Sequence, residues 1–168
     1  MVSVSIEQSP TDYFGWVECL KQLKTGIPDT NTFAVLRKGT CPEYEGIKSG
    51  MHKLIEESVN AVIANCLKAL KRDIARFSDA NETVGIHIAF VRFGKRINGC
   101  MFFTEMHFLD QRFCDELRHE TITQVTRFWS EMLNNIKKDS AARNNLRMAE
   151  ELFIIKRVKL LDKYRISA

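Results

Sequence analysis

The sequence has few of the residues that build loops for phosphates or nucleotides. Its eight glycines are scattered, and neither the dinucleotide-binding pattern nor the P-loop pattern occurs among them. No apolar run approaches the roughly 20 residues that cross a bilayer. Residues 1–9 also lack the basic stretch and apolar run of a secretory signal. These absences predict an intracellular, cytoplasmic protein that binds no membrane and carries no nucleotide cofactor.

Cysteine occurs in an odd number and without a repeating spacing. The five cysteines are Cys19, Cys41, Cys66, Cys100 and Cys114. In a chain without a secretory signal, this distribution indicates reduced thiols. Free cysteine is among the most buried residue types, so we expect these side chains to pack in the core.

The candidate metal ligands do not converge at short range. Cys100 and His107 are seven residues apart and would point to opposite faces of a strand. Cys114 and His119 would lie about 140° apart around a helix axis. A structural zinc site normally shows close ligand pairs. We therefore expect neither a metal nor another cofactor.

The composition is that of an ordinary globular protein. The chain has 168 residues, of which 45% are hydrophobic and 27% charged, enough for one core. No repeat, low-complexity tract or linker divides it, so we predict a single domain over residues 1–168. Its parts are a flexible N-terminus (1–9), N-terminal helices (10–78), a β-hairpin (83–109) and basic C-terminal helices (110–168).

The N-terminal part contains two predicted helices. Ser9 can cap the first, Pro10 suits its first position, and Gly26 and Pro28 end it. Residues 33–37 fit either a short helix or a strand. From Ser49 to Phe77 an apolar stripe recurs at helical spacing and predicts a long helix.

The C-terminal part is also predicted to be helical. Asp110 can cap a helix whose apolar stripe runs to Ile136. A final helix is expected over residues 146–165. The apolar run over residues 152–158 also fits a strand.

The region 83–109 has the pattern of a β-hairpin. Two runs rich in β-branched and aromatic residues flank Asn98-Gly99, the strongest short signal for a type I′ turn. The resulting register pairs Arg92 with Glu105, which have opposite charges. Both faces of such a ribbon would be apolar and both edges open, so other elements must cover it.

These patterns together predict an α+β fold. About five helices would surround a short antiparallel hairpin, which a third strand or dimerisation would extend into a larger sheet. The excess apolar surface of the hairpin and of the long helix predicts a homodimer.

Positive charge is concentrated near the C-terminus. Residues 1–125 hold 15 Lys and Arg against 16 Asp and Glu, whereas residues 126–168 hold 10 against 5. Such a local excess attracts nucleic-acid backbones. The candidate contacts in this segment are Lys137, Lys138, Arg143, Arg147, Lys156, Arg157, Lys159, Lys163 and Arg165. Lys95 and Arg96, on the arm that enters the predicted hairpin turn, would add a second contact.

Catalytic patterns are nearly absent. No serine or cysteine lies in a recognisable nucleophile context. Arg112 and His119 are seven residues apart, which places both on one face of a helix. This spacing is similar to the Arg-to-His motif of HEPN ribonucleases, in which they would act on RNA without a metal. That family is all-helical, and the predicted hairpin departs from it, so we predict a protein that is not an enzyme.

The sequence therefore favours a non-enzymatic nucleic-acid-binding or regulatory protein, acting as a homodimer through its basic C-terminal segment. The alternative is an accessory module whose apolar helix and hairpin surfaces bind a partner protein. A third interpretation is a small-molecule sensor with a pocket between the hairpin and the long helix.

Overall fold

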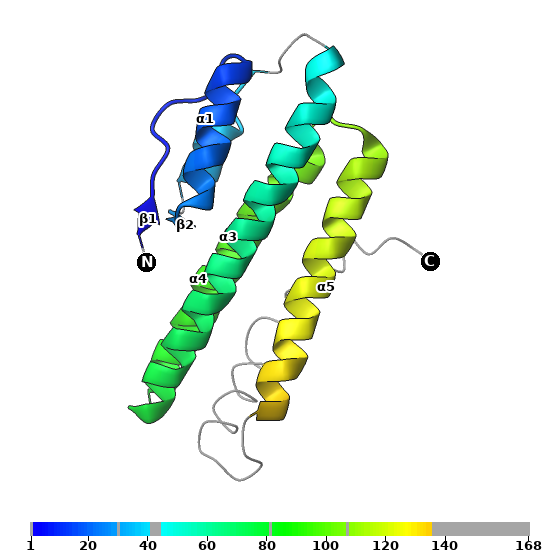
Figure 1. The fold of residues 1–168 in the computed structure, drawn as a ribbon. Helices are drawn as coiled ribbons and strands as arrows, with labels where there is room; N and C mark the ends of the chain where they lie inside the picture. Colours follow the sequence, from blue (N-terminus) through cyan, green and yellow to red (C-terminus); the bar gives the residue numbers. More distant parts are fainter. Residues whose placement is uncertain (1, 30, 41–44, 81, 107, 136–168) are drawn as a thin grey trace.

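A computed structural model describes residues 2–29, 31–40, 45–80, 82–106 and 108–135. In chain order its elements are β1 (Ser3–Val4), α1 (Tyr13–Lys24), β2 (Ile27–Pro28), α2 (Thr32–Leu36), α3 (Glu45–Asp79), α4 (Thr83–Cys100), the 3₁₀-helix η1 (Met101–Glu105) and α5 (Gln111–Asn135). The long helix α3 is central. Helices α1 and α5 flank it in Figure 1, and α4 lies behind it.

The predicted β-hairpin is wrong. The predicted α+β fold class, which depended on that hairpin, is wrong as well. Residues 83–100 form helix α4, and the chain continues directly into η1. The sheet in the described ranges is a two-stranded parallel pair, in which Ser3 aligns with Ile27 and Val4 with Pro28. The part of the chain that the structure describes is therefore mostly helical.

The alternation of apolar residues over 83–109 predicted strands, but the same residues also fit a helical period. Ile86, Phe90, Phe93 and Ile97 are all buried, and their spacings of four, three and four place them on one face of a helix. That face packs on α3. A helix that buries a long stripe on a neighbouring helix satisfies its backbone internally, which an isolated two-stranded ribbon does not.

Gly99 is needed for close packing and not for a turn. A Cβ at this position would lie 2.2 Å from the Phe33 ring, and the backbone has no left-handed φ. Gly85 likewise leaves room for Phe77, whose ring would lie 2.3 Å from an added Cβ. The predicted Arg92–Glu105 cross-strand pair is also absent, since Arg92 lies in α4 and Glu105 in η1. Glu105 instead forms an ion pair with Arg37.

Helix α1 begins later than its sequence suggests. Asp12 is the N-cap, and its carboxylate accepts a hydrogen bond from the Gly15 N–H at 2.7 Å. Ser9 instead donates to the Val35 carbonyl at 2.8 Å, which ties the N-terminal segment to α2. The predicted end near Gly26 is correct, since α1 stops at Lys24.

The other helical predictions for the described ranges hold. Residues 33–37 lie in the short helix α2 and at its C-cap, and α3 covers the whole of the predicted long helix. Asp110 caps α5 by accepting hydrogen bonds from the Arg112 and Phe113 N–H groups. The expected helix over 146–165 and the alternative strand over 152–158 lie outside the described residues.

The core is continuous from the N-terminal segment to α5. Val4 and Ile6 are buried in it, beside side chains from α1, α3, α4 and α5. Cys19, Cys66, Cys100 and Cys114 are buried free thiols, as predicted, and Cys41 lies outside the described residues. Burial raises the pKa of the Cys66 thiol to about 11. Within the described residues, no helix is long and apolar enough to span a bilayer.

Candidate ligand groove

A groove of about 750 Å³ opens between α1, α2 and the η1 segment. Its lining residues are Trp16, Leu36, Arg37, Gly39, Phe102, Glu105, Met106 and Phe108. Four of them come from residues that the sequence assigned to the second hairpin strand. The groove therefore forms where this stretch winds into η1 and places Phe102 and Phe108 against Trp16 of α1.

The floor of the groove is aromatic. The Trp16 indole stacks on Phe102, with ring centroids 6.5 Å apart, and lies 6.2 Å from the tilted ring of Phe108. The Trp16 Nε1–H donates to the Thr40 carbonyl at 2.8 Å. A hydrogen bond of this kind fixes the orientation of a buried indole. The hydrogen bond to Thr40 therefore orients the Trp16 ring in the floor.

The rim of the groove carries an opposite-charge pair. Nη1 of Arg37 donates to Oε2 of Glu105 at 3.3 Å, and the guanidinium lies 5.3 Å from the centroid of the Phe102 ring. The other Arg37 donors, Nε–H and Nη2–H, meet no acceptor in the described ranges. Because a guanidinium presents five N–H donors, Arg37 retains capacity for a second acceptor.

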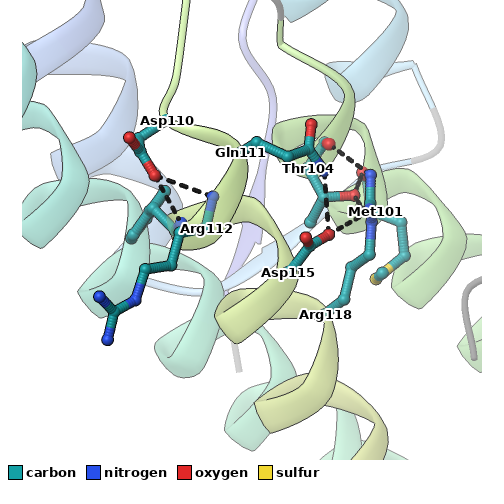
Figure 2. A network of polar contacts seen from close by, with 8 residues as sticks. Met101, Thr104, Asp110, Gln111, Arg112, Asp115 and Arg118 are labelled. Atoms are coloured by element: carbon teal, nitrogen blue, oxygen red, sulfur yellow. Dashed lines mark hydrogen bonds and ion pairs between the residues drawn. The ribbon is translucent and has the colours of Figure 1, made fainter. Parts of the chain in front are cut away.

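The η1 wall is held from α5 by Arg118. Its Nη2 donates to the Thr104 carbonyl at 2.7 Å and its Nε to the Thr104 hydroxyl at 3.0 Å. Asp115 pairs with Nη1 at 2.7 Å and orients the guanidinium. The Thr104 hydroxyl in turn donates to the Met101 carbonyl at 2.7 Å. Figure 2 shows that this network joins the start of α5 to the end of η1.

Replacing Arg118 with alanine is expected to lower the free energy of unfolding by about 1–3 kcal/mol, because the buried Thr104 groups lose charged donors. Arg112→Ala is the matched control on the same helix. Arg112 is 86% exposed and pairs with Glu116, one turn away, so its removal should change stability by no more than about 0.5 kcal/mol. Urea unfolding of both variants measures the difference. Equal losses would show that Arg118 does not hold η1.

The basic residues predicted to bind nucleic acid lie mostly beyond the described ranges. Lys95 is exposed on α4, whereas the half-buried Arg96 turns inward and donates to the Pro28 carbonyl at 3.3 Å. Neither residue is near a hairpin turn, because that turn does not exist. The others, Lys137, Lys138, Arg143, Arg147, Lys156, Arg157, Lys159, Lys163 and Arg165, lie outside the described residues.

The candidate ribonuclease pair is on α5. Arg112 and His119 are both exposed, and the Arg112 guanidinium is engaged by Glu116 at 2.9 Å. Neither lines the groove. Within the described ranges, no group of three His, Cys, Asp or Glu side chains is arranged to hold a metal ion.

Comparisons with known proteins give no relative from which to transfer a role: no family model, curated protein or solved structure matches this chain.

Proposed function

We propose that this protein is a non-enzymatic small-molecule sensor whose groove binds a flat, apolar carboxylate. The observation that carries the proposal is the aromatic floor of Trp16, Phe102 and Phe108 beside the Arg37 guanidinium. Ligand sites combine such apolar walls with a few polar groups that fix orientation. A volume of about 750 Å³ is within the range of roughly 300–1,000 Å³ that such sites have.

The charge of the ligand follows from the rim. A carboxylate at Arg37 would accept from the Nε–H and Nη2–H donors and form a charge-assisted pair. A flat apolar ring would then lie against Phe108, the half-buried ring of the floor, where an aromatic contact adds to area burial. Of the described lining residues only Arg37 and Glu105 are ionised, and they pair with each other. This supports binding over acid–base catalysis.

The test uses the Trp16 indole N–H resonance in a Trp129→Phe background, which leaves Trp16 as the sole tryptophan. The probes are 2-naphthoate and its neutral amide. We expect the resonance to shift saturably with 2-naphthoate. Arg37→Gln should weaken the binding of 2-naphthoate at least tenfold and leave the affinity for the neutral amide unchanged. Tenfold corresponds to about 1.4 kcal/mol, within the range of a charged hydrogen bond.

Arg112→Gln is the control, since it removes an exposed arginine away from the groove. Equal weakening by the two variants would assign the effect to net charge. A Trp16 resonance unmoved at millimolar 2-naphthoate would refute the proposed ligand class.

The charge excess of residues 126–168 favours a second proposal, that this segment binds nucleic acid. Gel shifts with mixed DNA and RNA across a salt series test it, because removing one lysine or arginine that binds a phosphate reduces the salt slope by about 1. Replacing Lys156, Arg157 and Lys159 with glutamine should weaken binding more than the same change at the exposed Lys68, Lys71 and Arg72 of α3. No binding at low salt would rule the proposal out.

A further inference from the structure

The outer face of α4 presents a line of exposed side chains that lie outside the core. Val84, Ile88, Arg92 and Lys95 follow one another at spacings of four, four and three, and all are exposed. Val84 is 72% and Ile88 41% exposed. The buried side chains of the same helix lie on its opposite face, and α4 packs on α3, behind which it lies in Figure 1. The line therefore combines an apolar half and a basic half on a helix that is already anchored.

The basic half carries charge without local compensation. Helix α4 contains Arg92, Lys95 and Arg96 and no Asp or Glu between Thr83 and Cys100. Arg96 is committed to the Pro28 carbonyl. Arg92 and Lys95 form no ion pair with any residue in the described ranges. No carboxylate in the described ranges neutralises their charges.

A second copy of this face is a poor occupant. If two α4 helices packed antiparallel over their full length, the apolar half of each would meet the basic half of the other. If they packed parallel, Arg92 and Lys95 would face the same cations, and like charges brought together are destabilising. The charge pattern therefore selects a different surface.

We propose that the outer face of α4 docks an amphipathic helix of a partner protein, with apolar residues opposite Val84 and Ile88 and acidic residues opposite Arg92 and Lys95. Apolar anchors at helical spacing with charges at one end are the usual features of helix recognition. This surface is separate from the groove, so it does not depend on the proposed ligand.

The probe is a labelled helical peptide of the same 18-residue length as α4. It carries Leu at its two apolar contact positions and Glu at its two polar ones, and it is made in both chain orders. A second pair of peptides has Lys in place of Glu. Fluorescence anisotropy with the full chain should show at least tenfold tighter binding of an acidic peptide than of the Lys peptides.

Three variants test the assignment. Ile88→Asp should abolish binding of the acidic peptide, and Lys95→Glu should reverse the preference between Glu and Lys peptides. Lys71→Glu makes the same charge change at an exposed site on α3 and should leave the preference in place. All three side chains lie outside the core, so unchanged far-UV circular dichroism is expected and verifies folding.

The proposal is overturned if neither acidic peptide is preferred, if Ile88→Asp binds as well as the unaltered chain, or if Lys71→Glu and Lys95→Glu act alike. It is also overturned if vesicles with one-quarter anionic lipid, or duplex DNA, bind through Lys95 and displace the peptide. In that case the face is a general anionic contact.

Discussion

Replacing Trp16 with alanine is expected to lower the free energy of unfolding by about 3–5 kcal/mol, the range for large aromatic side chains truncated in a core. Trp16 is 1% exposed, stacks on Phe102 and contacts Phe108. Its indole also holds the Thr40 carbonyl. The cavity left by the indole would join the groove, so the same variant should lose the proposed ligand.

Urea unfolding measures this effect, and α1 supplies its own control. Phe14 is an aromatic residue in the same helix but is 78% exposed, so Phe14→Ala should change stability by no more than about 0.5 kcal/mol. Trp16→Phe, which keeps a ring on the floor but lacks the indole N–H, should lose an intermediate amount. If Trp16→Ala and Phe14→Ala had similar effects, the aromatic floor would contribute little to the fold.

Replacing either of two glycines of α4 with alanine is expected to change the stability of the protein, in opposite directions at the two positions. Gly94 has open space around an added Cβ, so Gly94→Ala should stabilise the protein by about 0.5–1 kcal/mol through helix propensity alone. Gly99→Ala gains the same propensity but places its Cβ 2.2 Å from the buried Phe33 ring. Overpacking in a core costs about 1–3 kcal/mol, so a net loss of about 1–2 kcal/mol is expected.

Thermal and urea unfolding of the two variants give the sign of each change. The cause of the Gly99 loss is tested by repeating Gly99→Ala in a Phe33→Leu background, where the flexible side chain can move aside. The loss should shrink by at least about 1 kcal/mol, a coupling typical of residues that touch each other. An unchanged loss would mean that Gly99 is needed for backbone conformation, as in a turn.

The sequence predicted those helices whose stripe, caps and ends agree with one another. Helix α3 has a long apolar stripe, and α5 begins directly after a carboxylate that caps it. Residues 83–105 have no such agreement. Their β-branched and aromatic residues and Asn98-Gly99 favour a strand and a turn locally, while packing on α3 and the contact of Gly99 with Phe33 favour a helix. The tertiary contacts decided the outcome, and a local pattern does not contain them.

The groove could not be predicted from the sequence either, because it also depends on tertiary contacts. Trp16, Arg37 and Phe102 come from three different parts of the chain. From the local sequence alone, Trp16 is interpreted as a core ring, Arg37 as a surface charge and Phe102 as a strand residue. The Arg37–Glu105 pair joins positions 68 residues apart. A pocket was expected between the supposed hairpin and the long helix, but the groove lies where η1 meets α1 and α2. Its position depends on η1, which no local sequence pattern predicts.

The groove and the outer face of α4 both require that residues 83–105 form a helical wall, which brings Phe102 and Glu105 to the groove. Backbone ¹³Cα chemical shifts of the full chain measure whether these residues are helical. We predict helical shifts that run without interruption from Val84 through Asn98 and Gly99 to Thr104. Extended-chain shifts on both sides of a break at Asn98-Gly99 would instead show a hairpin, which would remove the wall, the groove and the α4 face together.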